Sequence, residues 1–469
     1  MMSEINFGTD GWRAIIGDTF TLDNVARVTE ATANWILNKN ENASIVIGYD
    51  CRFGGKMFAE TAALVLASFG VKSILSDRIV GTPNVSLATK EYEADLGIVI
   101  TASHNPPDYN GYKLKASFGG PLPPKEVSEI ENMIPEYCTV DFRNLSINDD
   151  QFKNLIEVKD IESLYIEKIE QTFDLDLIRQ NSHMFAYDPM YGAGQDVMRS
   201  ILPDITYIHA DKNPGFNGIA PEPIHRNLGA FSELIKSSAI QCGLATDGDA
   251  DRIGLYNGKG EFIDSHHIIL LLIKYLVEEK NLTGKVVNAF SVSPRIKTMC
   301  DHYNLPYQVV KIGFKYVAEI MVSEDVLLGG EESGGIAIKT HLPERDGIWM
   351  GLTIWEYMAK SGKSLEDLID EVYKIVGAFS FERIDLHLTE SQKISIMDNC
   401  KKGNYSRFGP YTIENIEDID GYKFFFENNQ WVMIRPSGTE PVLRTYAESS
   451  SSENAFDILE ETHKTLLSK

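Results

Sequence analysis

Residues 95–104 read Asp-Leu-Gly-Ile-Val-Ile-Thr-Ala-Ser-His, an apolar, β-branched run that passes directly into a polar loop. The same change from an apolar run to a polar or glycine-rich loop recurs at 44–50, 184–194, 285–293 and 325–332. This recurrence predicts α/β units with mostly parallel strands. Because ligand loops in this class follow the carboxyl ends of the strands, we expect the chemistry of the protein in these loops.

The chain of 469 residues is long enough for about three or four domains. The apolar runs recur at intervals that suggest several similar α/β domains, and no short repeat indicates a solenoid. Three junctions are expected: the polar stretch 144–154, the segment after Arg252, and residues 377–383. Beyond the last junction, 379–388 and 422–435 have strand-like patterns, which favours a smaller α+β domain at the C-terminus.

The charge balance makes binding to nucleic acid or anionic lipid improbable. Lysine and arginine number 44 against 68 aspartates and glutamates, a net charge of −24, and such a field repels polyanions. The longest apolar run, 268–273, ends at Lys274, and the N-terminus carries no signal-peptide pattern, so no membrane span or secretion is expected.

The five cysteines are widely spaced and never form a CxxC pair; they are Cys51, Cys138, Cys242, Cys300 and Cys400. Neither a disulfide scaffold nor a zinc ribbon is indicated, and a reducing, cytoplasmic location fits best.

Residues 101–113, Thr-Ala-Ser-His-Asn-Pro-Pro-Asp-Tyr-Asn-Gly-Tyr-Lys, form the most distinctive stretch. Two prolines and an Asn-Gly pair exclude a helix, so Ser103 and His104 are expected on an irregular loop at a strand end. A Ser-His-Asp hydrolase is not supported, because adjacent Ser and His rarely reach triad geometry and no GxSxG surrounds Ser103. A solvated polar turn is the alternative for such a Ser-His pair.

Residues 246–252, Thr-Asp-Gly-Asp-Ala-Asp-Arg, place Asp247, Asp249 and Asp251 at alternate positions after a strand-like run. Three such carboxylates repel one another unless a divalent cation lies among them, and oxygen ligands suit magnesium or calcium. An EF-hand is excluded, because Arg252 and Gly258 stand where that loop needs glycine and glutamate. A solvated acidic turn is the alternative.

Two further loops carry polar side chains among flexible backbone. Residues 329–335, Gly-Gly-Glu-Glu-Ser-Gly-Gly, let Glu331 and Ser333 face sugar hydroxyls, although a plain glycine-rich turn is the more frequent explanation of such a segment taken alone. Residues 435–441, Arg-Pro-Ser-Gly-Thr-Glu-Pro, compose a phosphate cradle from an arginine, two hydroxyls and backbone amides. Walker and kinase motifs are absent, which disfavours nucleotide-dependent phosphoryl transfer.

Together these four loops resemble those of the α-D-phosphohexomutase family, which includes phosphoglucomutases and phosphomannomutases. The opening residues 7–14, Phe-Gly-Thr-Asp-Gly-Trp-Arg-Ala, are also similar to that family. The resemblance implies four domains around a central cleft: three related α/β domains with mixed, mostly parallel sheets and a smaller α+β C-terminal domain. The expected segments are 1–150 with the phosphoserine loop, 151–252 with the metal loop, 253–376 with the sugar loop, and 377–469 with the phosphate loop.

The resemblance also implies an activity. The enzyme is expected to interconvert hexose 1-phosphate and hexose 6-phosphate, with glucose favoured and mannose next, through a phosphoserine at Ser103. The intermediate is a hexose 1,6-bisphosphate, which also acts as activator. Magnesium is expected on Asp247, Asp249, Asp251 and an oxygen of the Ser103 phosphate.

Further cations follow from the charge of that centre, because three carboxylates and a phosphoserine of about −1.5 to −2 exceed what one Mg²⁺ neutralises. Arg252, Lys113 and Arg13 match family positions near the reacting phosphate, and His104 is expected to hydrogen-bond there. We expect Lys113 to act as general acid or base with a lowered pKa, with a simple phosphate-binding lysine as the alternative.

Substrate-binding residues follow from the same resemblance. Glu331 and Ser333 are expected to read sugar hydroxyls, and Lys311 lies in the ligand loop 311–315, which is closer to the phosphoglucomutase version. The phosphate remote from the metal is expected on Arg435, Ser437, Gly438 and Thr439. Gly335 stands where many dual-specificity members carry a histidine, which leaves the sugar open.

Three alternatives remain. A magnesium-dependent sugar phosphatase would use Asp247 as nucleophile. A phosphoglucosamine mutase would use the same mechanism on another sugar. A non-enzymatic phosphosugar or calcium binder would not explain the Ser103 loop. Small hexose phosphates are the expected partners, and the chain is expected to be a monomer or a homodimer.

Overall fold

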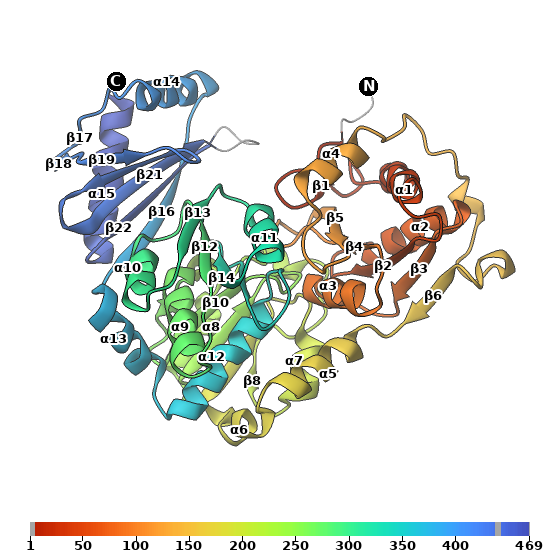
Figure 1. Ribbon diagram of the computed structural model, residues 1–469, viewed down its shortest axis with the longest axis horizontal. Coiled ribbons are helices and arrows are strands. Elements are labelled where there is room, and N and C mark those ends of the chain that lie inside the picture. The colour runs from red at the N-terminus through yellow and green to blue at the C-terminus, as the bar shows by residue number, and fades with distance from the viewer. Residues whose placement is uncertain (1–4, 437–441, 469) are drawn as a thin grey trace.

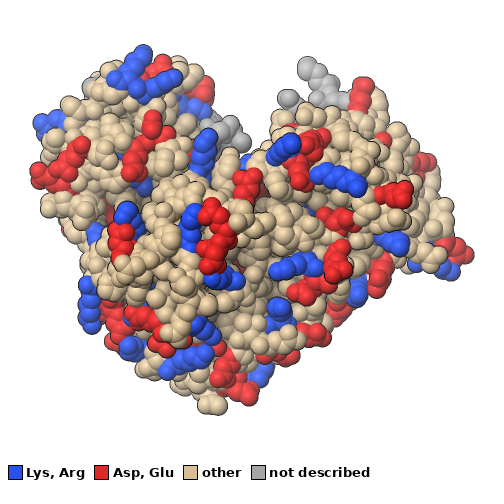
Figure 2. All heavy atoms as spheres, in the orientation of Figure 1, with Lys and Arg blue, Asp and Glu red and all other residues tan. Residues whose placement is uncertain are grey.

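The computed structural model describes residues 5–436 and 442–468. Four main sheets with their helices lie in chain order as four lobes, and the first and last lobes face each other across an opening (Figure 1). The space-filling view shows the same notch between these two lobes, with acidic and basic side chains interspersed over the visible face (Figure 2).

The first lobe is built on a six-stranded sheet of order β1-β5-β4-β2-β3-β6. Its central strands pair in parallel, whereas β5 runs antiparallel to both β4 and β1. The strands are β1 (Trp12–Ile15), β2 (Ser44–Tyr49), β3 (Lys72–Ser76), β4 (Leu96–Ile100), β5 (Tyr109–Ala116) and β6 (Ile156–Lys159). The helices are α1 (Leu22–Leu37), α2 (Gly55–Ser68), α3 (Thr82–Glu91) and α4 (Pro124–Glu131). All residues of β4 are buried, as the continuous apolar run predicts for a strand covered on both faces.

The second lobe has a five-stranded sheet of order β11-β10-β9-β7-β8. Its strands are β7 (Phe185–Asp188), β8 (Thr206–Tyr207), β9 (Cys242–Thr246), β10 (Ile253–Asn257) and β11 (Phe262–Ile263). Its helices are α5 (Glu162–Thr172), α6 (Leu175–Gln180), α7 (Gln195–Ile201) and α8 (Gly229–Lys236).

The third lobe has a four-stranded sheet of order β13-β12-β14-β15. Its strands are β12 (Lys285–Ala289), β13 (Tyr307–Val310), β14 (Val326–Gly330) and β15 (Ile336–Ile338). Its helices are α9 (Ser265–Glu278), α10 (Arg295–His302), α11 (Phe314–Ser323), α12 (Gly347–Ser361) and α13 (Leu365–Val376).

One arrangement recurs in these three sheets. A strand that pairs in parallel with its inner neighbour ends in a loop, and the chain returns as an antiparallel strand: β4 to β5, β9 to β10, and β14 to β15. The three connecting loops contain Ser103, the three aspartates and Glu331, respectively. The polar loops of the sequence therefore occupy equivalent places in three similar sheets.

The fourth lobe is smaller, and its sheet of order β16-β22-β21-β20-β19 is antiparallel throughout. Its strands are β16 (Ser380–His387), β19 (Asn415–Glu417), β20 (Tyr422–Phe426), β21 (Gln430–Pro436) and β22 (Val442–Ser449), with a separate pair β17 (Arg407–Phe408) and β18 (Tyr411–Thr412). Its helices are α14 (Glu390–Lys401) and α15 (Ser452–Leu467). The predicted α/β class with mixed sheets and an α+β C-terminal lobe is confirmed.

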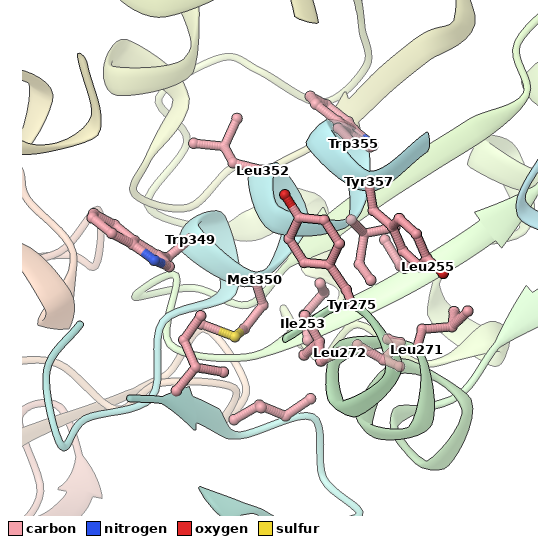
Figure 3. Close-up of a cluster of buried hydrophobic side chains, with 14 of the residues drawn as sticks. Ile253, Leu255, Leu271, Leu272, Tyr275, Trp349, Met350, Leu352, Trp355 and Tyr357 are labelled. Atoms are coloured by element: carbon pink, nitrogen blue, oxygen red, sulfur yellow. The ribbon is translucent and has the colours of Figure 1, made fainter. Parts of the chain in front are cut away.

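The largest apolar core is shared by the second and third lobes, whereas the first and fourth lobes have cores of their own. Helices α9 and α12 meet in this core, where Tyr275, Trp349 and Trp355 are almost fully buried (Figure 3). This shared core makes the second and third lobes the common base of the molecule.

The strands cross two of the predicted segment boundaries. Strand β6 begins six residues after position 150 yet pairs with β3, so the first sheet extends past that boundary. Strands β10 and β11 both follow Arg252. Strand β10 pairs with β9 and with β11, so the second sheet extends past residue 252. The polar stretch 144–154 is a surface excursion from which the chain returns to the sheet edge, and polar composition alone does not distinguish it from a linker.

All five cysteines are free thiols, four of them buried. Within residues 5–436 and 442–468, none of the helices combines the length and apolar character needed to cross a bilayer.

Candidate active site

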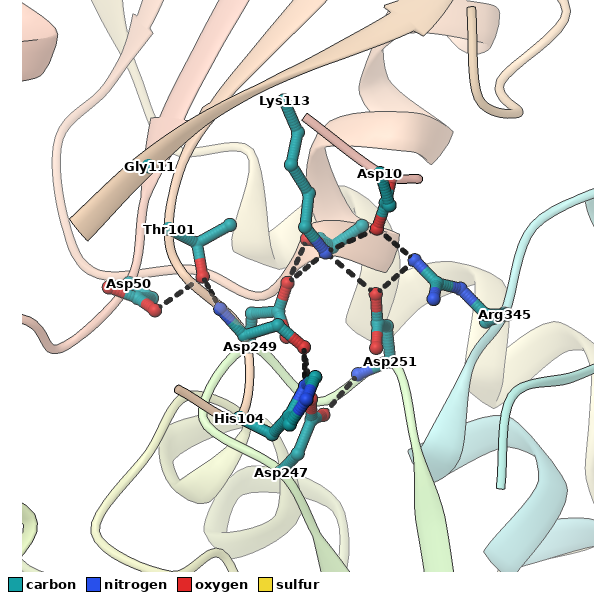
Figure 4. A network of polar contacts seen from close by, with 12 residues as sticks. Asp10, Asp50, Thr101, His104, Gly111, Lys113, Asp247, Asp249, Asp251 and Arg345 are labelled. Carbon is teal, nitrogen blue, oxygen red and sulfur yellow. Dashed lines mark hydrogen bonds and ion pairs between the residues drawn. The ribbon is translucent and has the colours of Figure 1, made fainter. Parts of the chain in front are cut away.

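The loops after β4, β9 and β15, together with strand β5, meet in one buried polar cluster contributed by the first three lobes (Figure 4). Ser103 and Lys113 come from the first lobe, Asp247, Asp249 and Asp251 from the second, and Arg345 from the third. Loop contacts between lobes reinforce the cluster, because the Ile253 N–H donates to Gly334 O at 3.1 Å. The sequence motifs that are far apart in the chain thus meet at one place.

Ser103 is fully buried and its Oγ donates to Asp247 Oδ2 at 2.6 Å. His104 Nδ1 lies 3.3 Å from the same Oγ, as expected for a side chain that hydrogen-bonds there. Ser103 has φ of +52°, a left-handed conformation that a serine adopts only when its surroundings enforce it. The loop therefore aims the hydroxyl at the first aspartate of the acidic motif.

The three aspartates form the group of carboxylates best suited to a cation among the described residues, since one oxygen from each lies within 4.8 Å of the others. All three side chains are buried, and in the described chain Asp249 Oδ1 and Asp251 Oδ1 accept no hydrogen bond. Burial, together with the charges of Asp249 and Asp251, holds the pKa of Asp247 well above its usual range. Buried, unpartnered carboxylate oxygens in a set of three fit Mg²⁺, which prefers such hard ligands.

Lys113 is fully buried, and its Nζ lies 2.7 Å from Asp249 Oδ2, 2.9 Å from Asp251 Oδ2 and 2.9 Å from Asp10 Oδ2 (Figure 4). Burial acts to lower the pKa of this lysine, but the three carboxylates outweigh it and raise the pKa. The expected lowering of the Lys113 pKa is therefore wrong for this arrangement. The lysine is a fixed cation that joins the first lobe to the aspartate loop.

Arg13 contacts the Ser103 loop, and His104 is part of that loop. Arg13 Nη1 donates to Asn105 Oδ1 at 2.8 Å, and burial lowers the pKa of its guanidinium while Asp10 acts to raise it. Burial and the nearby charges of Arg252 and Arg13 hold the pKa of His104 well below its usual range. These effects favour the neutral imidazole, which can donate one hydrogen bond and accept another.

Arg252 directly follows the aspartates and is half-buried. Its Nε is shielded from solvent and finds no hydrogen-bond acceptor among the described residues. An unpartnered guanidinium N–H beside this cluster suits a phosphate oxygen.

The third lobe contributes the loop with Glu331, which is 5% exposed and whose Oε1 accepts the Gly313 N–H at 3.0 Å. Burial raises the pKa of Glu331 to about 7, and the charge of Arg345 acts against this rise. Ser333 is half-buried, and Lys311 is exposed two residues before Gly313. The two predicted sugar-binding segments thus lie together, joined through Gly313.

Arg345 is a member of the cluster that we did not predict. Its Nη2 contacts Asp251 Oδ2 at 2.7 Å and also pairs closely with Asp10, which Lys113 contacts as well. The motif 344–347 that contains Arg345 follows the sugar loop closely in sequence, but no local pattern indicates which carboxylates it would reach. Arg345 links the sugar loop of the third lobe to the carboxylates of the first and second lobes.

In the fourth lobe, Arg435 lies at the end of β21 and its Nε is 3.4 Å from Asp420 Oδ1. Asp420 Oδ2 accepts the Ile312 N–H at 2.9 Å, so Arg435 is held toward the 311–315 loop of the third lobe. The other predicted phosphate-binding residues, Ser437, Gly438 and Thr439, lie outside the described residues.

Comparison with known proteins identifies the family. Four profiles, described as phosphoglucomutase/phosphomannomutase domains I, II and III and the C-terminal domain, match residues 4–139, 163–260, 264–376 and 385–464. A phosphoglucomutase/phosphomannomutase of Thermococcus kodakarensis is 30% identical over 97% of this chain and 96% of its own length. The chain belongs to the phosphoglucomutase/phosphomannomutase family. It is accordingly a phosphohexomutase, an isomerase that moves a phosphoryl group within a sugar phosphate.

Two further proteins are similar along their whole length. A phosphoglucosamine mutase of Methanococcus maripaludis is 31% identical over 97% of this chain and 96% of its own. The crystal structure of a putative phosphomannomutase from Thermus thermophilus superposes with a TM-score of 0.87 at 30% identity, covering 99% of this chain and 100% of the other. The predicted family is thus confirmed, with relatives that carry different sugar names.

Gly335 leaves no room for a side chain next to Arg345. A Cβ at this position would lie 2.4 Å from Arg345 Cδ and 3.0 Å from Arg345 Cγ. Gly335→Ala is therefore expected to displace Arg345 from Asp10 and Asp251 and to lower kcat/KM roughly 10- to 100-fold, equivalent to about 1.4–2.7 kcal/mol. Steady-state kinetics on a hexose phosphate measure the effect.

Gly229→Ala is the matched control, because a Cβ there meets nothing within 4 Å. We expect this variant to keep wild-type kinetics. Full activity of Gly335→Ala would show that Arg345 is not needed in its observed position.

Proposed function

We propose that this enzyme interconverts the 1-phosphate and 6-phosphate of a hexosamine, with glucosamine phosphate as substrate, through a phosphoserine at Ser103 and a hexosamine 1,6-bisphosphate. The observation that carries the chemistry is the hydrogen bond from Ser103 Oγ to Asp247, inside a carboxylate cluster with two unpartnered oxygens. The amino sugar is supported by relatives such as the phosphoglucosamine mutase of Methanococcus maripaludis.

The phosphoryl group is transferred in two half-reactions. In the first half-reaction the bond between phosphorus and the Ser103 oxygen breaks, a bond between phosphorus and a sugar oxygen forms, and the sugar hydroxyl loses its proton. In the second half-reaction the other phosphate of the 1,6-bisphosphate returns to Ser103: its bond to the sugar oxygen breaks, a bond to Ser103 Oγ forms, and the sugar oxygen takes up a proton. Asp247, Asp249 and Asp251 would hold Mg²⁺, which supplies charge neutralisation at the transferring phosphoryl oxygens. Arg13, Arg252 and Lys113 add fixed positive charge around the same group.

The proton needs a separate acceptor. Lys113 is unsuited, because its three carboxylate partners keep it charged. Glu331, whose pKa burial raises to about 7, is suited to exchange a proton with a sugar hydroxyl near neutral pH. Ser333 and Lys311 would contact the remaining hydroxyls and the distal phosphate, with Arg435, Ser437, Gly438 and Thr439 completing the distal phosphate site.

A second candidate substrate is glucose phosphate, with mannose phosphate next. It is supported by the Thermococcus kodakarensis relative and by the 311–315 segment, which is closer to the phosphoglucomutase version. The mechanism is the same for either sugar, and only the contacts at C2 differ.

A substrate panel tests the proposal. Glucosamine, glucose and mannose 1-phosphates are supplied with Mg²⁺ and a trace of the matching 1,6-bisphosphate, and phosphorus NMR follows the transfer from C1 to C6. We expect kcat/KM for glucosamine phosphate to exceed the others by about 10-fold or more, as for a site that hydrogen-bonds a distinguishing polar group.

A preference for glucose 1-phosphate would favour the second candidate. Release of inorganic phosphate without C6 phosphate would instead indicate the phosphatase alternative, with Asp247 as nucleophile.

A further inference from the structure

A buried group of side chains packs against the backbone of the Ser103 loop. It consists of Asp50 and Arg52, which follow β2, and Thr101, which follows β4. The Asp50 and Arg52 side chains have no exposed surface, and their closest charged atoms are 3.4 Å apart. The predicted chemistry gives none of these residues a role.

The terminal nitrogens of Arg52 bind the backbone of the loop. Its Nη2 donates to Ser103 O at 2.6 Å and Asn105 O at 2.7 Å, and its Nη1 donates to Pro106 O at 2.8 Å and Tyr109 O at 2.9 Å. An irregular loop cannot satisfy its own carbonyls, and buried carbonyls without partners are costly. One guanidinium therefore gathers four carbonyls of the Ser103 loop.

Asp50 and Thr101 hold the loop from its N–H side. Asp50 Oδ2 accepts the Thr101 hydroxyl at 2.6 Å, and Thr101 Oγ in turn accepts the Ser103 N–H at 2.8 Å. Ser103 is thus bound through both its N–H and its carbonyl. These contacts enforce the left-handed backbone that turns the Ser103 hydroxyl toward Asp247.

A side chain of the second lobe packs against Arg52. The ring of Phe216, which is fully buried, lies 4.9 Å from the Arg52 guanidinium carbon. The contact is a cation–π arrangement across the boundary between the first and second lobes. It fixes the plane of the guanidinium that holds the loop.

We propose that Arg52 is a positioning residue for phosphoryl transfer, which acts by holding the 103–109 loop so that Ser103 Oγ faces the aspartates. The inference rests on the proposed role of Ser103. Lysine cannot make the same contacts as the planar guanidinium of Arg52, because an ammonium carries only three N–H donors, all on one nitrogen. Misplacing a reacting group by about 1 Å costs on the order of 100-fold in rate.

The test is Arg52→Lys in the full-length enzyme, with kcat, KM, thermal midpoint and Ser103 phosphate content measured together. We expect kcat to fall about 100-fold with KM changed less than about threefold, and phosphorylation of Ser103 by hexose 1,6-bisphosphate to slow in parallel. Thr101→Val removes only one hydroxyl and is the second variant, in case Arg52→Lys does not fold; it should lower kcat at least about 10-fold.

Arg295→Lys is the matched control. Arg295 is also largely buried, donates to a backbone carbonyl and to Glu448, and lies 5.2 Å from the Phe379 ring, but it is far along the chain from the Ser103 loop. The Arg295→Lys variant should have a lower thermal midpoint than the wild-type enzyme while keeping most of its kcat. The inference is overturned if Arg52→Lys and Thr101→Val lose stability with kcat within about threefold of wild type, or if Arg295→Lys loses kcat equally. Failure of the proposed function would instead appear in the wild-type enzyme, as absence of phosphate on Ser103 during turnover.

Discussion

Ser103→Ala is expected to lose sugar-phosphate isomerisation by at least about 10⁴-fold while the protein remains folded. The side chain that disappears carries the only hydroxyl that contacts the aspartate cluster from the 103–109 loop in the described structure. The left-handed backbone at φ of +52° strains alanine about as much as serine, so we expect the loop conformation to be preserved. Turnover measures the loss, and intact-mass analysis after incubation with hexose 1,6-bisphosphate should detect one added phosphate on wild type alone.

Ser73→Ala is the control for this substitution. Ser73 is a buried serine of β3 in the same lobe, and its Oγ has no hydrogen-bond partner among the described residues. Its replacement should leave both turnover and phosphate content unchanged. Normal turnover in Ser103→Ala would overturn the phosphoserine assignment, and retained phosphate release without isomerisation would favour Asp247 as a nucleophile.

Asp249→Asn is expected to lower kcat/KM at least about 100-fold, equivalent to about 2.7 kcal/mol, and to raise the Mg²⁺ concentration needed for half-maximal activity. The substitution removes one of the three negative charges that face the cation site. It also weakens the contact to Lys113 at 2.7 Å and turns the Thr82 contact at 2.6 Å into a neutral one. Activity is measured across a Mg²⁺ titration, and calorimetry measures binding of Mg²⁺ directly.

Chelation completes this experiment. Excess EDTA should abolish turnover of the wild-type enzyme, and added Mg²⁺ should restore it. Asp204→Asn, an exposed aspartate of the second lobe, is the control and should keep the wild-type Mg²⁺ dependence. Full activity in excess EDTA, or an unchanged Mg²⁺ titration in Asp249→Asn, would contradict the metal assignment.

Buried cations offset part of the negative charge of the three aspartates. Lys113 and Arg345 are both buried and both contact Asp251, and Lys113 also contacts Asp249. Removing one partner of such a buried set leaves uncompensated charge, which costs about 3–5 kcal/mol. The same contacts tie three lobes together, so the site and the assembly of the lobes depend on one network.

The sequence by itself determined the elements and the loops that carry chemistry. Apolar runs such as 95–100 predict buried strands because a short continuous apolar segment suits a strand covered on both faces, and a strand cannot continue through the prolines at 106 and 107. The three aspartates at alternate positions predict a cation because their mutual repulsion is already present in a short peptide.

Only the tertiary structure decided which groups face one another. Lys113 and Asp249 are 136 positions apart, and Arg345 and Asp10 are 335 positions apart, so no local pattern encodes their contacts. The pKa of Lys113 was predicted in the wrong direction for this reason: burial lowers it, but the carboxylates that outweigh burial arrive from another lobe. The same holds for Arg52, whose four carbonyl partners become acceptors only when the loop is folded against it. Electrostatic and hydrogen-bond energies depend on distances of a few ångströms, and packing of the lobes, rather than spacing along the chain, sets those distances.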